Sequence, residues 1–188
     1  MVTLIDLWLP ILLSAVFVFI VSSIINMFLP YHKSDFKKLA QEDAVMDALR
    51  PFNIPEGDYF LPNDCETKGG MNSKEIQEKY AKGPVAMMTV CKSGPPNMAS
   101  SLILWFFYSI LVSILAAYVT TIALAPDAHY MIVFRYISST AFIGYSLALM
   151  QNSIWYKRNW GATLKSMFDG LIYALVTAGT FGWLWPKL

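Results

Sequence analysis

Four long apolar runs constrain this chain more than any other feature. They cover Leu7–Leu29, Ala99–Leu124, Tyr130–Met150 and Met167–Trp185. A helix needs about 20 apolar residues to cross a hydrocarbon core of roughly 30 Å, so each run is long enough to span a bilayer. The composition agrees, because 14% of the 188 residues are charged, whereas soluble domains carry roughly 25%. The sequence therefore predicts an all-α transmembrane protein with four spanning helices.

Basic residues predict which side of the membrane each segment occupies. They flank the inner ends of the runs, at positions Lys33, Lys37, Lys38, Lys92, Lys157, Arg158 and Lys165. The opposite ends carry almost none, with Lys187 the exception in the tail. Lys and Arg accumulate on the cytoplasmic side of membrane helices. We therefore expect both termini outside and the segments 30–98 and 151–166 in the cytoplasm.

The segment between the first two runs is too long to be a simple connection. Its pattern predicts a helix over 41–50, a strand at 59–61, a helix over 72–81 and a strand over 84–91. A unit of this size buries a marginal core by itself, so we expect it to lean on the membrane helices, the lipid or a partner chain. The predicted fold is a four-helix membrane bundle with a small α/β cytoplasmic cap inserted between helices 1 and 2.

The expected organisation follows from these boundaries. It comprises an outer tail with helix 1 at 1–29, the cap at 30–98, helix 2 at 99–124, helix 3 at 130–150, a cytoplasmic loop at 151–166, and helix 4 with an outer tail at 167–188. Aromatic side chains cluster at the predicted boundaries, where amphipathic rings favour the headgroup level. The expected interface anchors are Trp155, Tyr156, Trp160, Trp183 and Trp185.

The fourth run carries one small residue every four positions, namely Gly170, Ala174, Ala178 and Gly182. In lipid, such strips let helix backbones approach closely and so supply the contacts that hold helices together. The pattern predicts a compact packing of helices. It leaves open whether the strip faces another helix of the same chain or another subunit.

Polar groups within the predicted membrane region are the candidate sites. Arg135 lies about two turns into the third helix, where an unpaired charge is costly. It could pair with Asp6 or with Asp127, snorkel toward the outer interface, or serve transport. At the inner ends of the helices, an expected polar cluster contains Asn26, Asn152, Lys165 and Asp169, and Lys165 could pair with Asp169 one turn further on. These groups are expected to join helices.

Several kinds of chemistry find no support in the sequence. The net charge of +1 excludes the concentrated positive face of a nucleic-acid-binding protein. His32 and His129 fall at opposite membrane faces and therefore cannot ligate one haem. Cys65 and Cys91 lack the paired spacings of a zinc site. No catalytic motif, metal site or cofactor is predicted, so enzymatic activity is not the expectation.

The stretches NSIWYKRNW and MFDGLIYALVTAGTFGWLWP resemble the C-terminal halves of an uncharacterised family of small bacterial inner-membrane proteins with no assigned activity. The resemblance implies a bacterial cytoplasmic (inner) membrane and four spans. It implies no catalytic or binding residue.

Three functional hypotheses follow from the residues. The leading one is a non-enzymatic integral membrane protein, an accessory or assembly subunit that contacts the lipid bilayer and other membrane subunits. The alternative is a small transporter or a lipid- or quinone-binding protein that uses Arg135 and the inner polar cluster. A third class, the least supported, is a thiol or copper handler that uses Cys65 and Cys91.

Overall fold

A computed structural model describes residues 2–63 and 70–187. The chain divides into two compact units. The helical unit contains Met1–Lys37 and Asn97–Leu188, and the inserted unit contains Lys38–Pro96.

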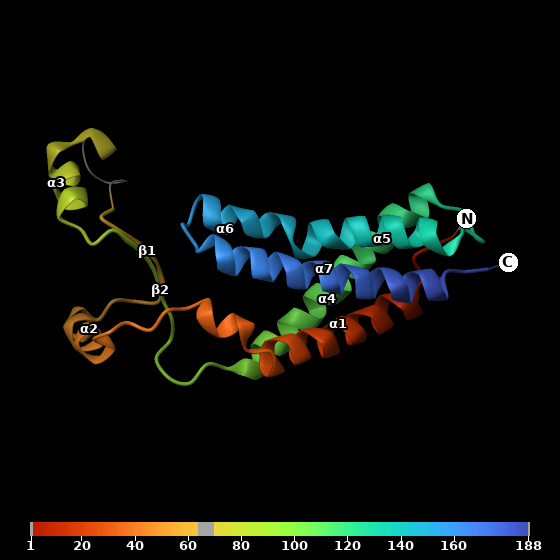
Figure 1. The fold of residues 1–188 in the computed structure, drawn as a ribbon, viewed down its shortest axis with the longest axis horizontal. Coiled ribbons are helices and arrows are strands. Elements are labelled where there is room, and N and C mark those ends of the chain that lie inside the picture. Colours follow the sequence, from red (N-terminus) through yellow and green to blue (C-terminus); the bar gives the residue numbers. More distant parts are fainter. Residues whose placement is uncertain (1, 64–69, 188) are drawn as a thin grey trace. The chain divides into compact units, whose positions relative to one another are not determined.

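The helical unit contains the long apolar helices (Figure 1). These are α1 (Trp8–Phe28), α4 (Met98–Ala123), α5 (Tyr130–Tyr145) with its continuation α6 (Met150–Ile154), and α7 (Trp160–Leu184). The described residues thus contain four helices long and apolar enough to cross a membrane, with α5 and α6 counted as one. The prediction of four helices of that length and apolar character is confirmed, and they support a multi-pass membrane protein.

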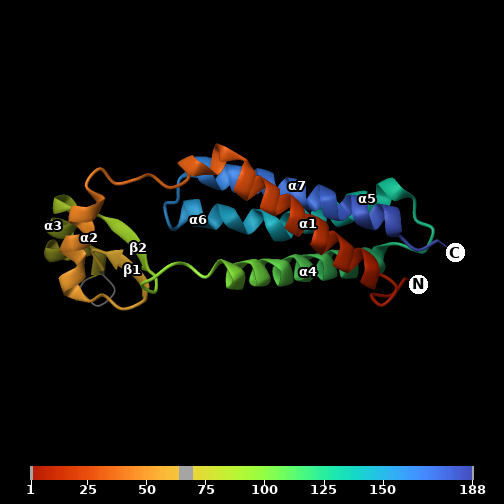
Figure 2. The same ribbon diagram turned by 90° about the horizontal axis from the view of Figure 1, so that it is seen from below.

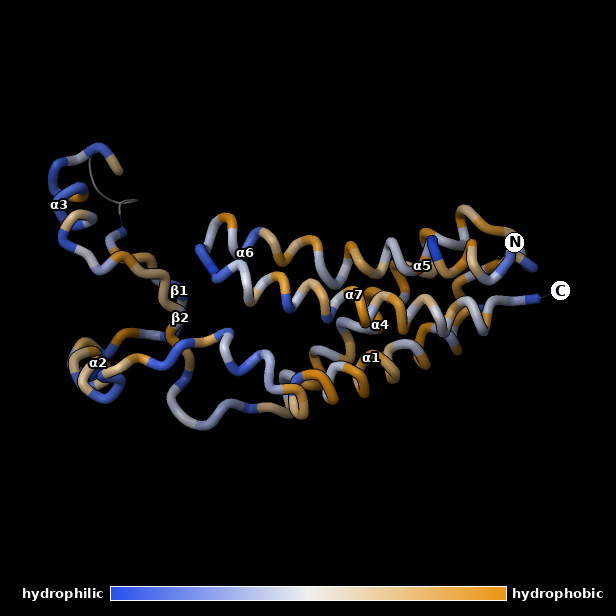
Figure 3. Tube along the Cα trace, in the orientation of Figure 1, coloured by the Kyte–Doolittle hydropathy of each residue, from blue (hydrophilic) through white to orange (hydrophobic). Residues whose placement is uncertain are grey.

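Both chain termini lie at the same end of the helical unit (Figure 2). The connection from α1 and the turn between α6 and α7 lie at the other end, which we call the inner end. Hydropathy follows the helices, with apolar residues along α1 and α4 and polar residues gathered near the helix ends (Figure 3).

The last helix begins earlier than the sequence pattern indicated. It starts at Trp160 rather than Met167, because Asn159 caps it and its side-chain oxygen accepts a hydrogen bond from the Gly161 amide at 2.7 Å. The expected loop at 151–166 therefore shrinks to the few residues between α6 and α7. The third span is interrupted by the 3-10 turn η4 (Leu147–Leu149).

The four helices pack in a ring of pairs, α1 with α4, α4 with α5, α5 with α7 and α7 with α1. The core contains large apolar side chains such as Leu7, Ile137 and Phe181. The buried residues also include ten with hydroxyl groups, namely Ser14, Ser22, Ser109, Ser113, Thr120, Ser146, Ser153, Thr163, Thr177 and Thr180. The hydroxyls of Ser14 and Ser113 hydrogen-bond to each other at 3.0 Å.

The small-residue strip of α7 is used inside the helical unit. All four of its members are buried. Gly170 lies against Tyr145 and Ser146, and Gly182 lies against the ring of Tyr130. The strip therefore brings α7 close to α5, which leaves it no free face for another subunit.

The described residues of the inserted unit form two α-helices and a two-stranded antiparallel sheet. Its elements are α2 (Glu42–Leu49), the 3-10 turn η2 (Arg50–Phe52), β1 (Gly57–Leu61), the 3-10 turn η3 (Gly70–Asn72), α3 (Lys74–Lys82) and β2 (Ala86–Val90). In the sheet, Tyr59 stands opposite Met88. Among the described residues of this unit, Ile76 is the one fully buried hydrophobic side chain. Two strands without a packed layer are marginally stable in water.

Candidate functional site

The most concentrated group of polar contacts lies at the inner end of the helical unit. It consists of Tyr31, His32, Asp35, Lys165 and Asp169, and we call it the His32 cluster. The first three residues belong to the short 3-10 turn η1 (Pro30–Ser34) and its C-cap, and the last two to α7. Pro30 cannot continue α1 and has a φ angle suited to a new turn. The turn therefore folds back against α7 and makes contacts there.

His32 lies between two carboxylates. Its Nδ1 is 2.7 Å from Asp35 Oδ2, and its Nε2 is 2.7 Å from Asp169 Oδ2. A neutral imidazole has one N–H, so it can donate to only one of two ionised carboxylates. The imidazolium form donates to both. Hydrogen bonds to both ionised carboxylates at once therefore require an N–H group on each ring nitrogen of His32.

Asp169 is the buried member of the cluster, with a relative exposure of 4%. One carboxylate oxygen meets His32, and the other accepts a hydrogen bond from the Tyr31 hydroxyl. Both oxygens thus have a partner from η1. A buried carboxylate is tolerated only when it is paired in this way.

The sequence suggested that Lys165 pairs with Asp169. In the structure it pairs instead with Asp35. Its ammonium donates to Asp35 Oδ1 at 2.9 Å, to the Tyr31 carbonyl at 2.6 Å and to Ser34 Oγ at 2.8 Å. An ammonium has three N–H donors, so all three are used. With an imidazolium at His32, two positive charges balance two carboxylates.

The electrostatics of the turn agree with this geometry. Burial acts to raise the pKa of Asp35, but hydrogen bonds and charges from His32 and Lys165 outweigh it and hold that pKa below its ordinary value. Burial, followed by the hydrogen bond to Asp169, raises the pKa of the Tyr31 hydroxyl. Asp35 is therefore ionised and Tyr31 is a neutral donor at neutral pH.

The structure brings together only part of the inner polar cluster expected from the sequence. Lys165 and Asp169 belong to the His32 cluster. The Asn26 side chain instead donates to the Ser22 carbonyl at 2.9 Å, and the Asn152 carbonyl accepts from the Arg158 amide. The sequence analysis did not assign Tyr31, His32 or Asp35 to a polar cluster. A histidine and an acid directly after a predicted membrane helix are a signal that could have indicated one.

Arg135 and Asp6 do not form the expected pair. The Asp6 carboxylate accepts hydrogen bonds from the Thr3 amide at 2.8 Å and from the Thr3 hydroxyl at 2.7 Å. Those bonds, the amide bond foremost, hold the pKa of Asp6 below its ordinary value. Arg135 is exposed on α5, and over residues 2–63 and 70–187 it makes no ion pair within 4.0 Å. Its long side chain suits snorkelling.

Four of the five expected aromatic anchors are exposed, with Trp155 and Trp183 each at 70%. The fifth differs, because Trp185 is 4% exposed and its indole N–H donates to the Ala125 carbonyl at 3.2 Å. Trp185 therefore packs against the segment between α4 and α5, and it is not available to lipid.

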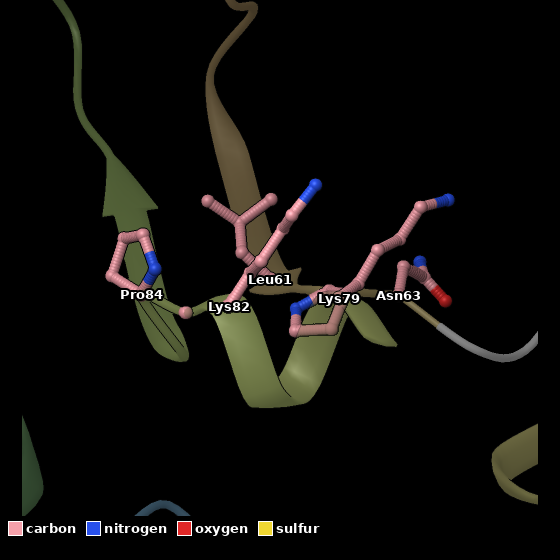
Figure 4. A pocket seen from close by; sticks show the side chains of 7 residues that line it. Leu61, Asn63, Lys79, Lys82 and Pro84 are labelled. Carbon is pink, nitrogen blue, oxygen red and sulfur yellow. The ribbon is translucent and has the colours of Figure 1, made fainter. Parts of the chain in front are cut away.

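The inserted unit has two open hollows. One has a volume of about 410 Å³ and is lined by the end of β1, by α3 and by the residues between α3 and β2. Its lining includes Leu61, Asn63, Lys79, Lys82 and Pro84 (Figure 4). Lys79 is paired with Glu75 at 2.5 Å. The other, of about 670 Å³, is an apolar groove between α2 and β2.

The described residues offer few side chains for metal binding or thiol chemistry. Within the part of the chain that the structure describes, no group of three or more His, Cys, Asp or Glu side chains could hold a metal ion. Cys91 is exposed with a free thiol. Cys65, its expected companion in a thiol or copper site, lies outside the described residues.

Comparisons with known proteins give no further guide. No family model matches the chain, and no curated protein or solved structure is significantly similar to it. Function has to be argued from the residues themselves. The hydrogen bonds of the His32 cluster join η1 and Asp35 to α7, so its geometry supports fastening the segment after α1 to α7.

Proposed function

We propose that this protein is a non-enzymatic integral membrane protein that binds other membrane protein subunits, as an accessory or assembly subunit of a larger bacterial membrane complex. In this proposal the helical unit is a four-helix membrane bundle, and the inserted unit is a small cytoplasmic cap that carries the binding surface.

The observation that carries the proposal is the apolar groove between α2 and β2. Its wall contains Met46, Leu49, Ile54, Met88 and Val90, with Arg50, Asn53 and Ser93 at polar positions. Met46 is 50% exposed and Leu49 is 39% exposed. A unit with so small a core gains stability by burying such side chains, at roughly 25 cal/mol for each Å² removed from water. A partner chain that covers the groove would supply that burial.

Site-specific photo-crosslinking in native membranes tests the proposal. A benzophenone amino acid at Met46 or Leu49 should give an adduct of discrete mass with another chain. The matched control is the same label at Glu78, an exposed residue of α3, which should give none. Leu49→Glu should remove the adduct formed at Met46, because it places a charge in the apolar groove. Equal labelling from Glu78, or a lone monomer in mild detergent without adducts, would contradict the proposal.

The proposed setting is a bacterial cytoplasmic membrane with both termini outside, since basic residues flank the inner end. Cys91 offers a direct test because its thiol is free and exposed. In a Cys65→Ser variant, a membrane-impermeant thiol reagent should label Cys91 in inverted membrane vesicles and not in intact spheroplasts. The reverse pattern would place the inserted unit outside.

A second candidate function is a small transporter or a lipid- or quinone-binding protein. Arg135 does not support it, because that side chain is exposed and does not join the polar groups at the inner end. The support comes from Asp169, a buried carboxylate that adjoins a hydroxyl-rich core. Asp169→Asn separates the two functions, since a transport residue should lose flux in a protein that still folds and assembles.

A further inference from the structure

The outward face of α5 carries polar groups. The side chains that α5 buries lie on one face of the helix and are Val133, Ile137, Ala141 and Tyr145. The opposite face is exposed and includes Arg135, Tyr136, Ser139 and Ile143. Residues three or four positions apart are neighbours on a helix surface, so Ser139 lies beside both Arg135 and Tyr136. We call these four exposed residues the Arg135 face.

Arg135 is the charged side chain of the candidate spans that stands apart from the others. The spans Trp8–Phe28, Met98–Ala123, Tyr130–Ile154 and Trp160–Leu184 contain two other charged residues, Lys165 and Asp169, and both belong to the His32 cluster. Over residues 2–63 and 70–187, Arg135 has no ion pair within 4.0 Å. A charged side chain within a membrane span is costly and is usually paired, so Arg135 calls for a partner.

The hydroxyl groups beside Arg135 differ in their hydrogen bonds. Ser138 and Thr140 donate to the carbonyls of Arg135 and Tyr136, at 3.2 Å and 2.9 Å, and are thereby satisfied within α5. Ser139 has no hydrogen-bond partner in the described part of the chain. Snorkelling suits the long side chain of Arg135, but the short side chain of Ser139 cannot use it. In lipid, a serine hydroxyl finds such a partner on a neighbouring helix.

The exposed faces of α4 and α5 differ in kind. The most apolar 18-residue stretch of each of these two spans is 28% buried, whereas that of α7 is 50% buried. The exposed side chains of α4 include Leu104, Phe107, Leu111 and Leu115, which are suited to lipid. The equally uncovered span of α5 instead presents a guanidinium and two hydroxyl groups. The Arg135 face is therefore poorly suited to lipid and well suited to a polar partner.

We propose that the Arg135 face binds a transmembrane helix of a partner subunit, and that an Asp or Glu side chain of that helix pairs with Arg135. The inference rests on the proposed function and adds a contact surface within the membrane. A carboxylate complements the guanidinium in charge and accepts two parallel N–H donors from it. A second copy of this chain does not fit, because a two-fold contact would place the same face against itself and bring two arginines together.

Photo-crosslinking within native membranes tests the partner. A benzophenone amino acid at Ile143 of the full-length protein should form an adduct with a different chain, and mass spectrometry should locate the adduct on a transmembrane helix that contains Asp or Glu. Leu111 of α4 is the matched control, because Ile143 and Leu111 are 58% and 53% exposed. The control should form no such adduct. Equal yields from the two positions, or an adduct with a second copy, would overturn the proposal.

Charge substitutions test the pairing. Arg135→Gln should lower the adduct yield from Ile143 about tenfold, which corresponds to about 1.4 kcal/mol of binding, and Arg135→Lys should retain most of it. Since Arg135 is exposed, neither change should alter the melting temperature of the purified protein. Arg135→Asp should abolish the adduct, and a Lys in place of the partner's acid should restore it. An unchanged yield with Arg135→Gln would overturn the pairing.

The label at Met46 in the groove separates this inference from the proposed function. An adduct from Met46 together with none from Ile143 would overturn the inference and leave the proposed function standing. The absence of adducts from both positions would contradict both. An adduct from Ile143 that depends on Arg135, with none from Met46, would support the inference and place the contact surface in the membrane.

Discussion

Replacing Asp169 by Ala is expected to lower the free energy of unfolding by about 3 kcal/mol, which is the usual cost of removing one partner of a buried ion pair. The change takes away the acceptor for the Tyr31 hydroxyl and for His32 Nε2. It also leaves Asp35 as the one carboxylate of the cluster that still contacts His32 and Lys165. The turn η1 then loses the two hydrogen bonds that join it to Asp169 of α7.

Thermal unfolding in detergent measures this effect, and limited proteolysis near η1 should report the released turn. For a chain of this size, 1 kcal/mol corresponds to roughly 2–4 °C in the melting temperature. Glu75→Gln is the control, because it also breaks a carboxylate ion pair, but at an exposed position on α3 where such pairs contribute little. An equal shift in the two variants would mean that the His32 cluster contributes no more than a surface pair.

Asp169→Asn adds the functional comparison. Asparagine keeps the shape of the side chain but removes the carboxylate charge that faces His32 Nε2. A variant that folds and assembles yet loses ion flux would favour the second candidate function over the structural role. A variant that loses stability and assembly together would favour the accessory-subunit proposal.

The number and placement of the long helices could be predicted because each apolar run carries its own signal. Length and hydropathy suffice for a helix in lipid, since all of its backbone hydrogen bonds close within the segment. Helix ends were less predictable. The start of α7 depends on a local cap at Asn159. The aromatic and basic residues around this position made the segment look like a loop, so the cap was not predicted.

The His32 cluster could be predicted only in part because it depends on a change of chain direction. Lys165 and Asp169 are one turn apart, so sequence spacing suggested that they pair. In the structure, η1 and its C-cap place His32 beside Asp169 and Asp35 beside Lys165. Each of the two α7 residues therefore pairs with this segment. The spacing of residues along one helix does not show which side chains a second segment of the chain places beside them.

Exposure was equally hard to infer from composition. Trp185 matches the pattern of an interfacial aromatic residue, yet it is buried because the segment after α4 supplies a carbonyl acceptor for its indole N–H. Arg135 suggested an internal pair, yet it points away from the core. The small-residue strip of α7 was expected to be a packing surface, and in the structure its two end glycines lie close to residues of α5 and its C-cap.

That contact makes Gly170→Ala the second change with a large expected effect. A Cβ atom at Gly170 would lie 2.1 Å from Ser146 Oγ, 3.1 Å from Tyr145 Cβ and 3.2 Å from the Tyr145 carbonyl oxygen. Ser146 is fully buried and is held by a hydrogen bond to the Met167 carbonyl. Since backbone and buried atoms both stand in the way, α5 and α7 must separate, and overpacking of this kind costs about 1–3 kcal/mol.

Gly179→Ala is the matched control on the same helix. The nearest atom to a Cβ at Gly179 is the Tyr130 hydroxyl at 3.9 Å, an ordinary contact distance. Alanine should be accepted there and should stabilise the helix by up to about 1 kcal/mol, because glycine loses more conformational freedom on folding. The two substitutions are chemically identical and should shift the melting temperature in opposite directions. A similar shift for both would mean that close approach of α5 to α7 at Gly170 does not hold the helical unit together.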